Sequence, residues 1–279
     1  MALAEHSVVS TRSAILQLLS AFAPPDSAAA MPVATLLAGT RVLGINENAA
    51  RVQLARLKSD GLVETPPDER GRYRLGEAAR AINAQVAGWR DIERRVCAWD
   101  EHSFIAVHTS GLGRSDRRAL ARRERALAFV GFRALRKGLF VRPQNLVGGV
   151  AQTRARLHEL GLPTAALVAG LDALDERSAR AARALWRDDD LDRRYARALE
   201  ALADSSERLP AIPLEQAARE AFIVGGAAIR LIVFDPLLPA PIVDASKRRA
   251  LVAAMTSYDK LGRRLWTSLL VHQRSSGVR

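Results

Sequence analysis

The 279-residue chain has little of what catalytic, metal-binding or secreted proteins depend on. A single cysteine, Cys97, excludes a disulfide framework and a cluster of thiolate metal ligands. The five histidines show no ligand spacing, and no Gly-x-Ser-x-Gly motif occurs. The most apolar stretch is interrupted by Gly225, Gly226 and Arg230 before it could span a bilayer, and no signal peptide is recognisable. We therefore expect a cytoplasmic protein that is not an enzyme, has no cofactor or metal, and buries Cys97 as a small apolar residue.

Acidic residues are also in deficit, with 30 against 42 lysines and arginines, and the net charge is +12. Such an excess favours an anionic partner. Most of it lies in residues 110–142, which hold ten basic and two acidic side chains. On a helix from Ser115 to Val130, one face would be apolar and the other would carry arginines. Three uses remain open for these cations: a solvated face, a second track along DNA phosphates, or a cradle for an anionic ligand.

The stretch Ile45–Leu62, INENAARVQLARLKSDGL, has the pattern of a capped amphipathic helix. Asn46 is a favourable N-cap, and Gly61 can adopt the left-handed conformation that ends a helix. Ala50, Leu54 and Leu57 recur at helical spacing and predict the buried face. The opposite face is then small and polar, as close approach to a DNA groove requires.

This outer face suggests how the helix would contact DNA. Asn48 and Arg51 can pair bidentately with base edges, and Val52 can meet a thymine methyl group. Arg56 and Lys58 flank the face and suit phosphates. With the loop arginines described next, the predicted DNA-binding residues are Asn46, Asn48, Arg51, Val52, Arg56, Lys58, Arg70 and Arg72.

The flanks predict a winged helix-turn-helix. A helix is expected over Arg12–Phe22 and the start of another at Pro32–Leu37. Downstream, two short strands, 62–64 and 72–75, are separated by TPPDERG, whose prolines and glycine indicate a turn. Arg70 and Arg72 are expected at the tip of this hairpin, where they could reach phosphates.

The rest of the chain predicts an α+β protein with further domains. Strand-like and helical runs alternate from Phe104 to Ala169, which fits a ferredoxin-like unit. The region beyond is rich in alanine, leucine and arginine and is expected to be mostly helical. The predicted organisation is a DNA-binding domain at 1–80, a helical connector at 81–97, a ferredoxin-like central domain at 98–170, and a C-terminal helical regulatory domain at 171–279.

Four separated blocks of the sequence resemble the PaaX family of bacterial transcriptional regulators. They are GINENAARVQLARLKSDGLVE (44–64), WDEHSFIAV (99–107), FVGFRALRKGLFVRPQNL (129–146) and LIVFDPLLPAPI (231–242). The resemblance implies a homodimer that binds a palindromic operator in double-stranded DNA. It also implies an anionic effector such as an acyl-coenzyme A thioester, and Arg136 and Arg142 would suit the phosphates of that effector.

The sequence therefore suggests a ligand-responsive transcriptional regulator, most simply a repressor. The alternative is an interaction or scaffold protein that uses the same helix and the arginine-rich region to bind an acidic partner. Salt dependence of binding to duplex DNA separates the two, because neutralising phosphates releases counterions.

Overall fold

The computed structural model describes residues 9–22, 30–113, 116–187 and 190–276, and the fold is α+β. The chain divides into two compact units. Unit 1 comprises Met1–Arg90, Ala198–Arg230 and Val252–Arg279, and unit 2 comprises Asp91–Arg197 and Leu231–Leu251. Each unit is therefore assembled from segments far apart in the sequence. The region 171–279, expected to form one domain, contributes residues to both units.

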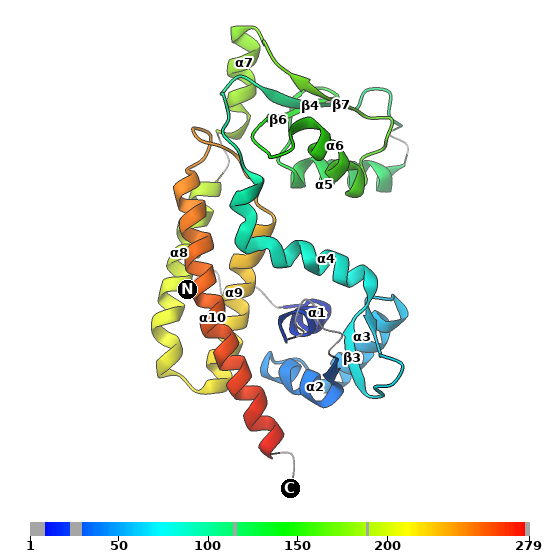
Figure 1. Ribbon diagram of the computed structural model, residues 1–279, viewed down its shortest axis with the longest axis vertical. Coiled ribbons are helices and arrows are strands. Elements are labelled where there is room, and N and C mark those ends of the chain that lie inside the picture. Colours follow the sequence, from blue (N-terminus) through cyan, green and yellow to red (C-terminus); the bar gives the residue numbers. More distant parts are fainter. Residues whose placement is uncertain (1–8, 23–29, 114–115, 188–189, 277–279) are drawn as a thin grey trace. The chain divides into compact units, whose positions relative to one another are not determined.

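Unit 1 begins with three helices and a small antiparallel sheet (Figure 1). The sheet has the strand order β1-β3-β2, in which Met31 pairs with Tyr73 and Val63 pairs with Leu75. The elements are α1 (Thr11–Phe22), β1 (Met31–Pro32), α2 (Val33–Val42), α3 (Glu47–Ser59), β2 (Val63–Glu64), β3 (Arg72–Leu75) and α4 (Glu77–Ala87). The three helices and the two-stranded hairpin expected from the sequence are confirmed.

The core of unit 1 joins these N-terminal elements to helices from the end of the chain. Ile15, Leu18 and Leu57 pack in one cluster with Ala218 and Trp266. The distant residues come from three helices: α8 (Leu191–Arg208), α9 (Leu214–Val233) and α10 (Ala245–Ser276), which contribute their 198–208, 214–230 and 252–276 portions to this unit. The N-terminal elements therefore share their core with residues about 200 positions away in the sequence.

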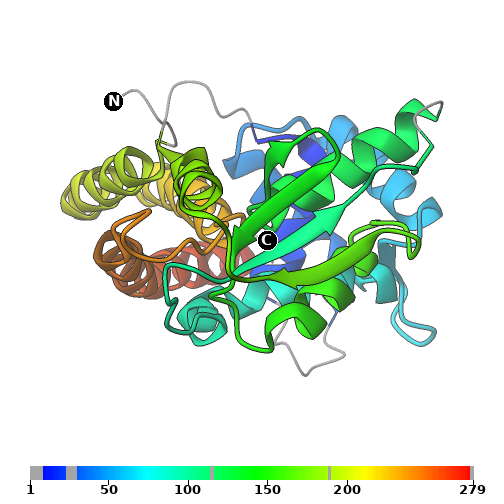
Figure 2. The ribbon, with the colours of Figure 1, turned by 90° about the horizontal axis from the view of Figure 1, so that it is seen from above.

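Unit 2 is built on a four-stranded antiparallel sheet with the order β5-β6-β4-β7. Its elements are β4 (Phe104–His108), α5 (Arg117–Phe129), β5 (Arg133–Arg136), β6 (Leu139–Pro143), α6 (Gly149–Glu159), β7 (Leu167–Leu171) and α7 (Glu176–Arg183). Helices α5 and α6 lie on one face of the sheet (Figure 1), and Figure 2 looks onto the opposite face. Ile105, Val107, Leu127 and Leu157 are buried between the sheet and these helices.

Two local expectations for this region need correction. Strand β5 was not expected from the sequence, and its four residues alternate between half-buried and exposed. Cys97 is exposed and not a buried apolar residue. Its backbone N–H donates to the carbonyl of Asn145 at 2.9 Å, which ties the main chain at this position to the segment that follows β6.

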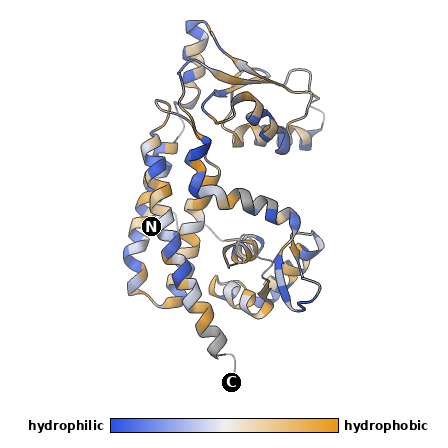
Figure 3. Ribbon diagram, viewed as in Figure 1, coloured by the Kyte–Doolittle hydropathy of each residue, from blue (hydrophilic) through white to orange (hydrophobic). Residues whose placement is uncertain are grey.

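None of the helices in the described ranges combines the length and apolar character needed to cross a membrane. Figure 3 shows hydrophilic and hydrophobic residues side by side along α8, α9 and α10.

Candidate nucleic-acid interface

Helix α3 is capped and seated as its sequence predicts. The side-chain oxygen of Asn46 accepts a hydrogen bond from the backbone N–H of Asn48 at 2.8 Å, and Gly61 has a positive φ of 68° just past the helix end. Ala50, Leu54 and Leu57 are buried. Because Leu54 and Leu57 belong to the unit 1 core, packing in that core sets the orientation of α3.

The opposite face of α3 is open to solvent. Asn48, Val52 and Ala55 form its ridge, and Ser59, which was not singled out from the sequence, continues it. Val52 is 46% exposed and is among the most exposed large apolar side chains of the described residues. A ridge of small side chains lets a helix approach the floor of a DNA groove closely.

An acidic residue engages the arginine predicted to read bases. The Nη2 and Nε atoms of Arg51 lie 2.8 and 3.1 Å from Oε1 of Glu47. Arg41, at the end of α2, approaches the other Glu47 oxygen at 3.3 Å. Hydrogen bonds from Arg51, and secondarily from Arg41, hold the pKa of Glu47 below its ordinary value. Arg51 is therefore held at the N-terminal end of α3, with Glu47 as its partner.

The side chains of the flanking cations Arg56 and Lys58 are exposed and form no ion pair or hydrogen bond with the residues that the structure describes. They project from α3 on opposite sides of its outer ridge. Arg70 lies in the loop between β2 and β3. Its side chain is also exposed and forms no ion pair or hydrogen bond with the residues that the structure describes. These three cations are available to an external anion.

Arg72 differs from its predicted position at the loop tip. It is the first residue of β3, pairs across the sheet with Pro32, and is half-buried. Its guanidinium forms an ion pair with Glu69 at 2.6 Å and donates to the carbonyl of Ala30 at 2.5 Å. The turn is completed at Gly71, with a φ of 76°, so the chain has already entered the strand at Arg72. Arg72 therefore braces the hairpin, and of the two predicted loop arginines Arg70 alone is free to contact a phosphate.

The structure does not bring together the two residues predicted to hold an anionic effector. Arg142 pairs with Ile105 across the sheet, whereas Arg136 pairs with Leu139, which itself pairs with His108. Cross-strand partners share a face, and positions 105 and 108 of one strand lie on opposite faces. Arg136 and Arg142 therefore lie on opposite faces of the sheet.

Arg142 is also fully committed inside unit 2, with 1% of its surface exposed. Its guanidinium donates to the carbonyl of Val130, to that of Pro143 at 3.0 Å and to Oδ1 of Asn145 at 2.7 Å. Burial lowers its pKa to about 9, which leaves it charged at neutral pH. Arg142 is thus a structural cation with no free donor direction toward an external ligand.

The described residues contain no group of three or more histidine, cysteine, aspartate or glutamate side chains that could hold a metal ion. Arg123 was counted only as one of the ten basic residues of 110–142 and was assigned to neither face of the helix. It falls three residues after Leu120 and four before Leu127, on the inner face of α5, and it is 6% exposed.

Comparison with known proteins shows the fold alone. No family model matches the chain, and no curated protein matches its sequence. A solved structure that resembles it is the uncharacterized protein Rv0674 from Mycobacterium tuberculosis, with 22% identity and a TM-score of 0.61. The match covers 91% of this chain and 97% of that one, so the likeness extends through both units.

Proposed function

We propose that this protein is a DNA-binding transcriptional regulator in which α1, α2, α3 and the β2–β3 hairpin form a winged helix-turn-helix. The observation that carries the proposal is the outer face of α3. It is exposed, small and polar, it stands on a helix fixed by core packing, and the unpaired Arg56 and Lys58 flank it. Such a helix suits the major groove, with cations at its sides for the phosphates.

The wing is the hairpin that follows α3. Its loop carries the exposed Arg70, and at the end of the loop the guanidinium of Arg72 donates to the carbonyl of Ala30. An exposed cation on this loop suits a phosphate contact beside the groove that α3 would occupy. Glu64 at the base of the hairpin is neutralised by Arg74 and Arg80, at 2.7 and 3.0 Å, which reduces the repulsion that DNA would meet there.

In this proposal, unit 2 is a ferredoxin-like regulatory domain. The order of its elements, β4-α5-β5-β6-α6-β7, and its strand order are those expected of a ferredoxin-like domain. Together with the four blocks that resemble the PaaX family, this arrangement favours a regulator that dimerises on a palindromic operator and responds to an anionic effector. Each of these finer points is part of the proposal.

The test is the salt dependence of binding to duplex DNA. A double variant, Arg56→Gln with Lys58→Gln, removes two cations that have no internal partner, so the fold loses no ion pair. We expect its affinity for random duplex to fall. The slope of log affinity against log salt should decrease by about one for each lost contact.

A matched control carries the same loss of charge on α10: Lys260→Gln with Arg264→Gln, both exposed and unpaired among the described residues. We expect this control to bind random duplex like the unchanged protein. If both double variants lose affinity equally, binding reflects net charge and not α3. If the unchanged protein shows no salt-dependent affinity for duplex DNA, the alternative of an acidic protein partner is favoured.

A further inference from the structure

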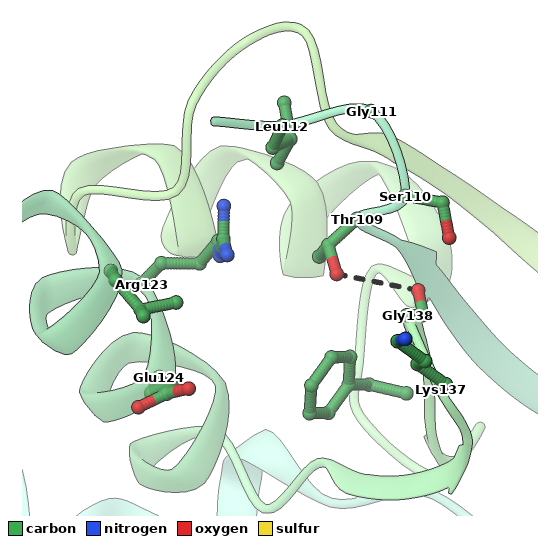
Figure 4. Close-up of a pocket in the computed structure, with 10 residues that line it drawn as sticks. Thr109, Ser110, Gly111, Leu112, Arg123, Glu124, Lys137 and Gly138 are labelled. Carbon is green, nitrogen blue, oxygen red and sulfur yellow. Dashed lines mark hydrogen bonds between the residues drawn. The ribbon is translucent and has the colours of Figure 1, made fainter. Parts of the chain in front are cut away.

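Unit 2 contains a cavity of about 290 Å³ between the C-terminal end of β4, helix α5 and the β5–β6 turn (Figure 4). Its polar lining includes Thr109, Ser110, Arg123 and Lys137, and its apolar lining includes Leu120 and Phe140. The volume lies just below the range of about 300–1,000 Å³ typical of ligand sites. The cavity therefore suits a small molecule and not a complete coenzyme A thioester.

Arg123 is the most informative residue of this cavity. Its side chain is more than nine-tenths buried, and it forms no ion pair or hydrogen bond with any residue that the structure describes. Figure 4 shows its guanidinium pointing into the cavity, toward the side formed by Thr109. A buried cation is costly unless it is paired or hydrogen-bonded. Arg123 thus presents unused donors to a confined space.

Arg142 in the same unit shows what a purely structural buried arginine looks like in this fold. Arg142 is directed at three acceptors of the protein, the carbonyls of Val130 and Pro143 and the carboxamide of Asn145. Arg123 is nearly as buried and is directed at none of the described residues. The contrast indicates that the acceptors for Arg123 come from outside the chain.

The wall opposite α5 is held in place without a ligand. The backbone N–H of Thr109 donates to the carbonyl of Gly138 at 2.7 Å, and the Thr109 hydroxyl approaches the same oxygen at 3.3 Å. Gly138 has a φ of 77°, and a Cβ there would lie 2.3 Å from Oγ of Ser110. The β5–β6 turn therefore sits tightly against the end of β4, and it carries Lys137, which lines the cavity.

The charges of the lining restrict the ligand. Arg123 and Lys137 are cationic and Glu124 is anionic, which leaves one positive charge in excess. One anionic group balances that excess, and a planar carboxylate matches the paired donors of a guanidinium. Leu112, Leu120 and Phe140 offer apolar contact to the remainder of the ligand.

We propose that this cavity binds a small organic monocarboxylate, with its carboxylate on Arg123 and Lys137 and its apolar body against Leu120 and Phe140. Binding itself does not depend on the proposed DNA-binding function. Its consequence does: occupancy of the cavity would regulate DNA binding only if the ligand has different affinities for the free and DNA-bound forms.

The test is calorimetric or NMR titration of the full chain, without DNA, using hexanoate and benzoate. Hexanamide and benzamide serve as neutral analogues, and inorganic phosphate serves as an anion with no apolar body. We expect one or both carboxylates to bind at least tenfold more tightly than their amides. Arg123→Gln should remove most of that difference, and Lys137→Gln, which changes an exposed residue and leaves the core intact, should weaken carboxylate binding severalfold.

Arg118→Gln is the matched control, because Arg118 is exposed on the same helix and carries the same charge. Three outcomes overturn the proposal: no carboxylate binds at millimolar concentration, phosphate binds and carboxylates do not, or Arg118→Gln weakens binding as much as Lys137→Gln does. A failure here leaves the salt-dependence test of DNA binding unaffected, since that test uses no small ligand.

Discussion

Glu47 is the single acidic residue of α3, and it lies at the end of the helix where Asn48 and Arg51 are also found. It balances the charge of Arg51 and Arg41 in the absence of DNA. On DNA, the same carboxylate would face the phosphates and repel them. The ion pairs are exposed, and exposed pairs contribute little to stability, so Arg51 can exchange Glu47 for a base or phosphate at small cost.

We therefore predict that Glu47→Gln raises the affinity for random duplex DNA by about fivefold at low salt, because the variant lacks a negative charge that would repel the phosphates. The gain should shrink as salt is added, because screening weakens exposed charges. Glu215→Gln, which removes an exposed carboxylate on α9, is the control and should have no effect. A lower affinity for Glu47→Gln would show instead that Glu47 positions Arg51 for DNA.

The burial of Arg123 could have been predicted from the sequence, whereas the burial of Arg142 could not. The inward position of Arg123 follows from its spacing to Leu120 and Leu127, and a reading by periodicity could have found it. The burial of Arg142 could not be found in this way, because it depends on strand pairing. A shift of one residue in register moves every side chain of a strand to the other face, and no local pattern fixes the register of β6 against β4.

Elements with strong end signals are predicted well from this sequence, and short ones are not. Helix α3 has an N-cap, a buried stripe and a glycine at its end, and all three appear where expected. Strand β5 has four residues, and three of them, Arg133, Ala134 and Arg136, are polar or small. No proline flanks the strand, so its sequence carries no strand signal. Its existence depends on pairing with β6, which is a long-range effect of the fold.

Strand β6 is tied to the end of α5 and to the loop after α9 through one buried arginine. Arg142 donates to the carbonyl of Val130, and Asn145, which it also contacts, donates to the carbonyl of Leu237 at 2.7 Å. These contacts connect two of the sequence blocks noted above, 129–146 and 231–242. The chain therefore uses polar contacts, in addition to apolar packing, to hold the loop of residues 234–244 to the sheet.

Replacing Arg142 with methionine keeps the apolar bulk but leaves these buried acceptors without donors. We predict that Arg142→Met lowers the free energy of unfolding by about 2–5 kcal/mol in urea denaturation, because an unsatisfied buried polar group costs about 1–3 kcal/mol. Arg136→Gln, an exposed change on the neighbouring strand, should stay within about 0.5 kcal/mol of the unchanged protein. Equal stabilities of the two variants would contradict the structural role assigned to Arg142.

The assembly of unit 1 from three separate segments was outside the reach of the sequence analysis. The DNA-binding domain predicted from the sequence ends at residue 80, because the strand signals of the hairpin end shortly before that position. The core, however, includes Ala218, Trp266 and Leu269. Such contacts between distant segments cannot be predicted from a local sequence pattern. The sequence of each helix shows that it has an apolar face but does not show which segment that face contacts.

Trp266 is the residue through which this assembly can be tested. Its indole N–H donates to the carbonyl of Ala218 at 2.9 Å, and a Cβ at Gly39 of α2 would lie 3.5 Å from its ring. Arg263, one turn earlier, donates to the carbonyl of Ala21 at the end of α1 at 2.7 Å. The candidate DNA-binding elements are thus supported by α10.

We predict that Trp266→Ala destabilises the full chain by about 3–5 kcal/mol, the usual cost of truncating a large buried aromatic residue. Amide hydrogen exchange in α1 and α2 should accelerate together with that of α10, because these helices share one core. Trp266→Phe is the matched control. It keeps most of the packing and loses the hydrogen bond to Ala218, which costs about 1 kcal/mol. If exchange in α1 and α2 is unchanged in Trp266→Ala, the N-terminal elements fold independently of α10, and a fragment ending at residue 80 should then retain the proposed affinity for DNA.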